Sequence, residues 1–336
     1  MQRVRVILAA HGEAETCGFV ENFRISRHTL GHAAEVMRLP SALRLAICTV
    51  AGLRKRMRGG PGSPHNENTG RQAAALEQAL ANDEVFRYRV DPAFASSPPY
   101  LGETIEQSDD VDRLIVVTMI PTDSRLSCGL ICRSLNAAPD SLRRRSNVVA
   151  RLWEDPELVA IHCAHVAEHF ARTEPDTPHC LVLVLHGTLM RDKHGHEPAF
   201  HTGADEKTVY GEALRAALLA MPDRRWSRVE IAYLNHGVGG QWSSPTLPEL
   251  LERLASEGVR NVTAYAAEHL VDGGETGQLP ELLAAGPFAA THCLPCLNTR
   301  PAFIDFLAAR VRAAVHAEAT ERCCDPCPLR MRAAST

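Results

Sequence analysis

The chain has 336 residues, of which 45% are hydrophobic and 23% are charged, and its formal net charge is −4. This length is typical of two domains, and the composition is that of a globular protein. The negative charge argues against a nucleic-acid-binding protein, and no apolar run is long enough to cross a bilayer. Because a strand pattern begins at Val4, the start does not resemble a signal peptide. We expect a cytoplasmic protein, a monomer or homodimer, with peripheral membrane contact left open.

The first half of the chain predicts strands that alternate with helices. We expect a strand over Val4–Ala10, a helix over Arg71–Ala81 and a second strand over Arg113–Ile120. Apolar residues thin out over the charged stretch Arg143–Asn147, which is typical of a join between domains. An N-terminal domain is therefore predicted over residues 1–147.

The second half repeats this alternation more clearly. Cys180–Leu185 is a continuous apolar run, as expected for a strand that is covered on both faces. The further expected elements are a helix over Asp205–Met221, a strand over Val229–Leu234, a helix after the possible capping box of Thr246 and Glu249, a strand over Val259–Ala266 and a helix after Pro301. A C-terminal domain is predicted over residues 148–318, followed by a cysteine-rich tail over 319–336.

This alternation predicts an α/β protein with two similar, doubly wound parallel-sheet domains and a cleft between them. Both halves open with an apolar strand that ends in the same pair of residues, His11-Gly12 and His186-Gly187. In open α/β sheets, ligands bind outside the carboxyl ends of the strands. One such histidine is more simply explained as a hydrogen-bonded strand end, but a matched pair favours function.

An acidic loop, EHLVDGGETGQLPE at 268–281, follows a later strand of the second half. It carries His269, Asp272 and Glu275 at intervals of three residues. At the same sheet edge as His186, these groups could pass protons or a cation across a cleft, although a solvated acidic loop fits equally well. No G-x-G-x-x-G or G-x-S-x-G motif accompanies them, which argues against a dinucleotide-binding fold and a hydrolase triad.

Six segments, taken in order over Val4–Ala314, resemble ferrochelatases. They are GGPGSPHNENTGRQAAAL (59–76), VVTMIPTDSRLSCG (116–129), LHGTL (185–189), GVGGQWSSPT (237–246), HLVDGGET (269–276) and PCLNTRPAFIDFL (295–307). Ferrochelatases insert Fe²⁺ into a porphyrin held between two similar α/β domains. The resemblance therefore implies that porphyrin and ferrous iron are the substrates.

The resemblance also implies roles for particular residues. His186 accepts the pyrrole protons, and Glu275 with Asp272 shuttles protons or guides the cation, so His186 and Glu275 are the expected contacts of the Fe²⁺ substrate. Trp242 lines the wall that faces the porphyrin, with simple core packing as the alternative. His269 and His11 are further candidate substrate contacts. A first strand that ends in His-Gly is unusual in ferrochelatases and is similar to the smaller sirohydrochlorin chelatases.

The tail sequence RCCDPCPLR (322–330) places three cysteines within five residues. In a cytoplasmic protein this spacing favours metal or cluster ligation over a disulfide. Many ferrochelatases hold a [2Fe–2S] cluster on cysteines of a C-terminal extension and one from the first domain. The resemblance implies Cys323, Cys324 and Cys327 with Cys128 as such ligands, and free thiols are the alternative.

Two other functions stay open at this point. One is another tetrapyrrole chelatase that inserts Co²⁺ or Ni²⁺ or acts on sirohydrochlorin. The other is a non-catalytic haem- or metal-binding protein on the same fold. The presence of both His186 and Glu275 favours an enzyme, because haem carriage does not need a paired base and acid. The pattern does not choose between protoporphyrin IX and coproporphyrin III.

Overall fold

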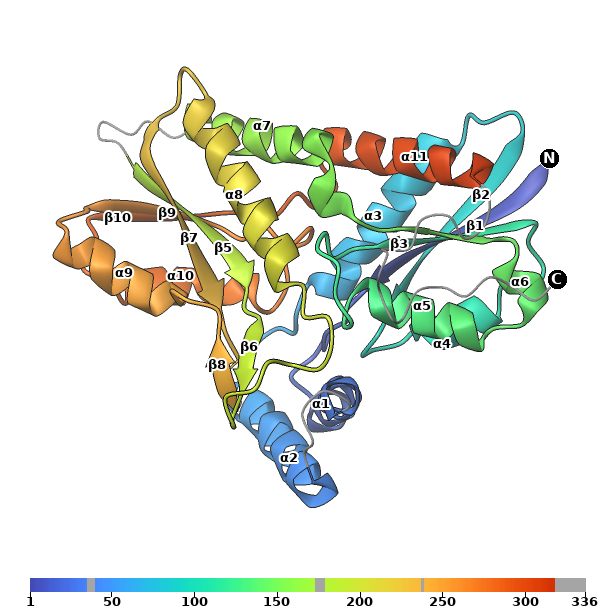
Figure 1. Ribbon diagram of the computed structural model, residues 1–336, viewed down its shortest axis with the longest axis horizontal. Coiled ribbons are helices and arrows are strands. Elements are labelled where there is room, and N and C mark those ends of the chain that lie inside the picture. The colour runs from blue at the N-terminus through green and yellow to red at the C-terminus, as the bar shows by residue number, and fades with distance from the viewer. Residues whose placement is uncertain (35–39, 173–178, 237–238, 318–336) are drawn as a thin grey trace. The chain divides into compact units, whose positions relative to one another are not determined.

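The computed structural model describes residues 1–34, 40–172, 179–236 and 239–317 (Figure 1). These residues form two compact units. The first comprises residues 1–150, 199–201 and, of the last described stretch, 304–317, and the second comprises residues 151–198 and 202–303. Helix α11 (Pro301–His316) begins in the second unit and continues in the first. The boundaries expected at residues 147 and 318 stay predictions, and the tail lies outside the described residues.

The first unit is built on a parallel sheet of four strands in the order β2-β1-β3-β4. The strands are β1 (Gln2–Ala10), β2 (Phe86–Phe94), β3 (Arg113–Thr118) and β4 (Ser146–Val149). The two central strands, β1 and β3, carry the apolar runs and are buried along most of their length. Both faces of these strands are covered, which explains the uninterrupted hydrophobic pattern.

Helices cover both faces of this sheet. One face packs on α4 (Leu101–Glu106), α5 (Cys128–Ala137) and α6 (Asp140–Arg143), which share one core cluster with β1 and β3. On the other face, α3 (His65–Leu80) runs beside β1 and β2.

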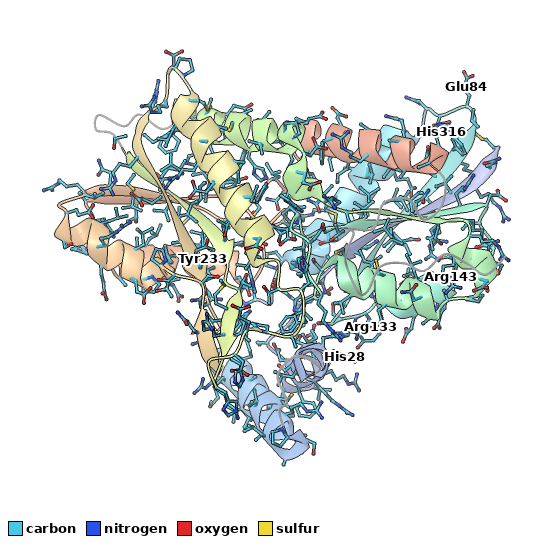
Figure 2. All side chains as sticks on the ribbon, viewed as in Figure 1. His28, Glu84, Arg133, Arg143, Tyr233 and His316 are labelled. Carbon is cyan, nitrogen blue, oxygen red and sulfur yellow. The ribbon has the colours of Figure 1, made fainter. Side chains whose placement is uncertain are left out.

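The first unit contains two further features. Helices α1 (Phe19–Ala34) and α2 (Ser41–Arg58) pack against each other. The end of α11, where Figure 2 labels His316, also belongs to this unit. The ring of His316 packs edge-on against Phe86, with centroids 5.4 Å apart. The last helix of the chain therefore packs beside β2, and its residues Val311, Ala314 and Val315 are buried.

The second unit has its own parallel sheet, in the order β10-β9-β5-β7. Its strands are β5 (His179–His186), β7 (Trp226–Leu234), β9 (Asn261–Tyr265) and β10 (Ala290–Leu294). The central strands β5 and β9 are the buried ones. The carboxyl end of β5 therefore lies at the middle of the sheet edge, where a ligand site of this fold class is expected.

Helices again lie on both faces. The side chains of Val182, Val184 and Val262 form a core cluster with α9 (Leu247–Ser256) and α10 (Leu279–Ala284). The opposite face of the sheet carries α7 (Pro156–Arg172) and α8 (Ala204–Ala220), which pack on each other and above β5 and β7 (Figure 1). The α/β class with two doubly wound parallel sheets is thereby confirmed.

Two local features bear on the site. The expected capping box is present at the start of α9, where Thr246 accepts from the Glu249 N–H and Glu249 accepts from the Thr246 N–H. The short strands β6 (Leu189–Asp192) and β8 (Gly240–Trp242) pair as an antiparallel ribbon beyond the ends of β5 and β7. Among the described residues, no helix combines the length and the apolar character that crossing a membrane requires.

Candidate functional site

The backbone of His186 is held on both sides by buried charged side chains. Its N–H donates to Glu268 Oε2 at 2.9 Å, and its carbonyl oxygen accepts from Lys207 Nζ at 3.0 Å. Lys207 and Glu268 also form an ion pair at 3.4 Å, and their side chains are 9% and 3% exposed. Because the N–H and the carbonyl oxygen of His186 are both held, the backbone from which its imidazole projects is fixed.

The residue after His186 is a glycine, Gly187, and no side chain would fit at this position. A Cβ at this position would lie 1.9 Å from Asn235 Oδ1 and 2.7 Å from the Leu234 carbonyl oxygen. The glycine N–H instead donates to that carbonyl at 2.7 Å. The ends of β5 and β7 therefore approach closely, and the residue after Asn235, which is His236, is brought beside His186.

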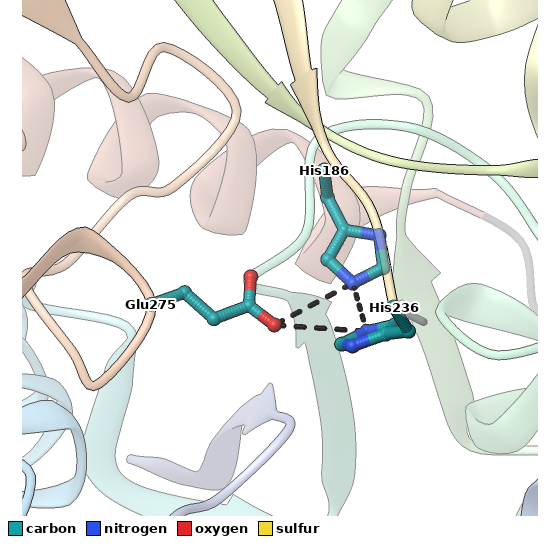
Figure 3. Close-up of side chains that lie close together, drawn as sticks. All are labelled: His186, His236 and Glu275. Carbon is teal, nitrogen blue, oxygen red and sulfur yellow. Dashed lines mark hydrogen bonds and ion pairs between the residues drawn. The ribbon is translucent and has the colours of Figure 1, made fainter. Parts of the chain in front are cut away.

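Three side chains meet at this point (Figure 3). The Nε2 atoms of His186 and His236 are 2.9 Å apart. Glu275 Oε1 lies 3.6 Å from the first of these nitrogens and 3.7 Å from the second. Of the described residues, these three form the one group whose ligand atoms are close enough to hold a metal ion together. The structure thus brings His186 and Glu275 together and adds His236.

His269 orients the carboxylate of Glu275. Its Nε2 donates to Glu275 Oε2 at 3.1 Å, which leaves Oε1 directed at the two other imidazoles. His269 and Glu275, the first and last of the three residues that the sequence singled out in the acidic loop, are therefore in contact. His269 acts here through the carboxylate that it holds.

The electrostatics of the site favour a neutral base beside an ionised carboxylate. Burial, reinforced by the charge of Lys207 and partly offset by that of Glu275, lowers the pKa of His186 to about 4. Burial alone would raise the pKa of Glu275, but the interactions with His186 and His269 outweigh it and hold that pKa well below its usual range. Near pH 7 the site therefore presents the neutral imidazole of His186 and the negative charge of Glu275, which suits proton acceptance or cation binding.

Asp272 is used differently from Glu275. Its Oδ1 accepts from the backbone N–H of Cys296 at 2.9 Å, and its Oδ2 accepts from Asn298 Nδ2 at 2.7 Å. Its own N–H donates to Asn298 Oδ1 at 3.0 Å. Asp272 therefore ties the acidic loop to the segment that follows β10.

Trp242 lies next to the three-residue group. Its ring packs edge-on against His236, with centroids 5.6 Å apart and an interplanar angle of 80°. It ends β8, which pairs with β6 through Leu189, so the ribbon carries the tryptophan to the ends of β5 and β7. The side chain is partly exposed, which leaves part of the ring available for a ligand.

His11 belongs to the first unit and follows β1. Its carbonyl oxygen accepts from the Ser96 N–H at 2.9 Å. Gly12 has a φ of +82°, and a Cβ there would meet Ser97 Oγ at 2.4 Å. The glycines of the two His-Gly pairs are thus both required by close neighbours. A substrate contact by His11 stays a prediction.

Of the four cysteines expected to hold a [2Fe–2S] cluster, the structure describes one. Cys128 is buried at the start of α5, and its thiol donates to the Ser124 carbonyl oxygen at 3.7 Å. Cys323, Cys324 and Cys327 lie outside the described residues. The [2Fe–2S] ligand set therefore stays a prediction.

Sequence reasoning missed three residues of the site, His236, Glu268 and Lys207. His236 had a visible signal, because the apolar strand Val229–Leu234 is followed by Asn-His-Gly, a third strand end of the His-Gly type. Glu268 and Lys207 had no such signal, since buried charged residues look like surface ones until their partners are known.

Comparison with known proteins is consistent with this geometry. The sequence model of a family described as ferrochelatase matches residues 3–315. The chain is 28% identical over 245 residues to the ferrochelatase of Opitutus terrae, which covers 66% of this chain and 68% of that protein. It is 26% identical to the ferrochelatase of Desulfotalea psychrophila, over 73% and 75% of the two chains. The structure of SirB from Bacillus subtilis with Fe³⁺ superimposes with a TM-score of 0.52 at 12% identity, covering 94% of this chain and 96% of SirB, which supports the fold.

Proposed function

The chain belongs to the ferrochelatase family, and on that basis we propose that it inserts Fe²⁺ into protoporphyrin IX or coproporphyrin III in haem biosynthesis. The family expected from the sequence is thereby confirmed, and it supports a metal-chelating enzyme whose substrates are a porphyrin and ferrous iron. The observation that carries the chelatase proposal is the approach of His186 Nε2 to Glu275 Oε1, at 3.6 Å. A base and an anionic group stand together at the carboxyl end of a central strand.

Metal insertion must remove two pyrrole N–H protons and deliver a cation to the same nitrogens. In our proposal the imidazole of His186, which its lowered pKa keeps neutral near pH 7, exchanges its hydrogen bond with His236 Nε2 for a pyrrole N–H and accepts that proton at Nε2. The carboxylate of Glu275 attracts the cation, and its negative charge stabilises the imidazolium that forms when His186 takes up the proton. Trp242 offers a partly exposed ring for the porphyrin face.

The proposal is tested by incubating the purified protein anaerobically with protoporphyrin IX, coproporphyrin III or sirohydrochlorin and with Fe²⁺, Co²⁺ or Zn²⁺. Metal insertion changes the visible absorption of the macrocycle, so initial rates follow directly. Faster turnover of one porphyrin with Fe²⁺ supports the proposal and identifies the substrate. Turnover confined to Co²⁺ and sirohydrochlorin, which the His-Gly end of β1 would favour, replaces it with the other chelatase activity. Haem binding without any turnover identifies a binding protein.

Asp272→Asn is expected to lower stability more than it lowers the insertion rate. The amide replaces one acceptor oxygen with a donor, which then faces either the Cys296 N–H or the Asn298 amide. Losing such a partly buried hydrogen bond costs about 1–3 kcal/mol. Thermal unfolding and initial rates, measured on the same preparation, separate the two effects. A large fall in rate with unchanged stability would place Asp272 in proton transfer itself.

A [2Fe–2S] cluster on the tail is part of the proposal. If Cys323, Cys324 and Cys327 hold it with Cys128, anaerobically purified protein is expected to be reddish-brown, with about two iron and two sulfide per chain. Cys128 would first have to release its hydrogen bond to the Ser124 carbonyl.

Cys327→Ser is expected to bleach this colour. Cys48→Ser is the matched control, because Cys48 is a buried thiol of α2 and no ligand in the predicted set. A colourless protein that lacks acid-labile sulfide after anaerobic reconstitution would leave the tail cysteines as ordinary thiols. The proposed roles of His186 and Glu275 do not depend on that result.

Peripheral membrane contact also stays a proposal, as does the choice between monomer and homodimer. Helix α2 supports the membrane contact because it exposes apolar side chains beside basic ones. Those side chains are Leu43, Leu45, Val50, Leu53 and Met57, next to Arg54, Lys55, Arg56 and Arg58. An apolar face with adjacent positive charge suits the surface of an anionic membrane.

A further inference from the structure

The three ligand atoms of the site have the spacing of a metal's coordination sphere. The distances between them are 2.9, 3.6 and 3.7 Å. Donors about 2.1 Å from a first-row cation lie about 3.0 Å apart at right angles and about 3.4 Å apart in a tetrahedron. A cation can therefore contact all three atoms after shifts of a few tenths of an ångström. Two imidazoles and one carboxylate also form a donor set that suits Fe²⁺ and its neighbours.

The surroundings hold two of these ligands in place before a cation arrives. His269 occupies Glu275 Oε2, so that Oε1 remains directed at the two imidazoles. The backbone of His186 is fixed by Lys207 and Glu268. Contacts of this kind orient metal ligands and typically change metal affinity by about 10–100-fold.

His236 differs from its two partners in exposure. Its side chain is 52% exposed, whereas those of His186 and Glu275 are 34% and 27% exposed. Its ring is steadied on one side by the edge-on contact with Trp242. The third ligand therefore lies on the solvent side, where a hydrated cation arrives first, and three protein ligands leave further coordination positions open for water or a second substrate.

We propose that His236 completes a three-residue site with His186 and Glu275 that binds a divalent first-row transition cation directly, in the absence of porphyrin. This inference rests on the proposed function in treating the cation as a substrate, and it adds the ligand that captures it. Imidazole ligands favour Fe²⁺, Co²⁺ and Zn²⁺ over Mg²⁺ and Ca²⁺, which prefer oxygen. The site therefore selects its cation class before the macrocycle arrives.

The test uses Co²⁺ alone as the probe, with metal-free full-length protein and no porphyrin. Visible d–d absorption reports the geometry of bound Co²⁺, and titration gives its stoichiometry and Kd. We expect the unmodified site to take up one Co²⁺ and His236→Ala to weaken that binding by at least about tenfold. His194→Ala is the matched control, because His194 is an exposed histidine of the β6 turn outside this site.

A second variant, His236→Cys, reports ligation directly. If side chain 236 contacts the metal, Co²⁺ produces a thiolate-to-cobalt charge-transfer band in the near ultraviolet. A role of His236 in folding alone does not produce this band. The proposal is overturned if His236→Ala binds Co²⁺ as tightly as the unmodified protein, or if His236→Cys binds Co²⁺ without the new band.

The same preparations are then assayed for insertion of Fe²⁺ into porphyrin, which keeps the two proposals distinguishable. Cation binding that depends on His236 without any insertion would refute the proposed function and leave the cation site standing. If the His236→Ala protein binds Co²⁺ with unchanged affinity and inserts Fe²⁺ normally, the cation site is refuted and the proposed function stands.

Discussion

His186→Ala is expected to abolish metal insertion while changing porphyrin affinity by less than about tenfold. Removal of a general base typically costs a factor of about 10²–10⁴ in rate. Porphyrin affinity depends on the much larger area of the macrocycle, to which one partly exposed imidazole contributes little. Initial rates from the absorption assay and porphyrin binding from fluorescence quenching give the two quantities.

The fold is expected to tolerate this substitution. The contacts of His186 with Glu268 and Lys207 are made by its backbone, so alanine keeps them. Added imidazole should restore part of the activity if the missing group is a proton acceptor. An alanine variant with full turnover would move the role of base to another residue, and His11 would be tested next.

How much of the fold was predictable depended on how apolar each strand is. The central strands β1, β3, β5 and β9 and the edge strand β7 were all expected, and the run is uninterrupted in β5, because burial on both faces removes polar residues. The edge strand β2 was missed. Its sequence FRYRVDPAF alternates buried with exposed residues and contains Pro92, which an edge position tolerates.

The site was predictable to the extent that local sequence determined it. A histidine at the end of an apolar strand lies at the carboxyl edge of the sheet, whatever position that strand has in the strand order. His186 could therefore be identified without knowledge of its neighbours. Its approach to Glu275 depends on the order β9-β5-β7, and its contact with His236 depends on the close approach that Gly187 allows. Distances of this kind follow from packing between segments, which spacing along one chain does not encode.

The same reasoning separates the roles within the acidic loop. Asp272 and Glu275 are three residues apart, and the sequence offered no reason to treat one as structural. In the structure, Asp272 accepts from the backbone N–H of Cys296 and the side chain of Asn298, whereas Glu275 faces His186. Loop residues of the same type can therefore have opposite roles according to the segment that each one meets.

Glu275→Gln is expected to slow insertion by a factor of about 10²–10⁴, because the amide neither stabilises a protonated His186 nor attracts a cation. Glutamine has nearly the same shape as glutamate, so the substitution changes the charge of the site far more than its packing. If the amide oxygen keeps the hydrogen bond from His269, the amide nitrogen turns toward His186 and His236 and donates to a lone pair that the reaction needs. The charge of the carboxylate raises the pKa of His186, so its loss in the glutamine variant lowers that pKa further.

Glu281→Gln is the matched control, since Glu281 is an exposed residue of α10, a few positions further along the same segment. It should leave both the rate and thermal stability unchanged. Initial rates with Fe²⁺ and a saturating porphyrin, measured beside Co²⁺ affinity without porphyrin, then divide the effect of Glu275→Gln between cation binding and proton transfer. Weaker Co²⁺ binding with a rate restored at high metal concentration would assign Glu275 to the cation alone. A variant with unchanged rates would remove the acidic loop from the mechanism and favour a protein that binds porphyrin or metal without catalysis.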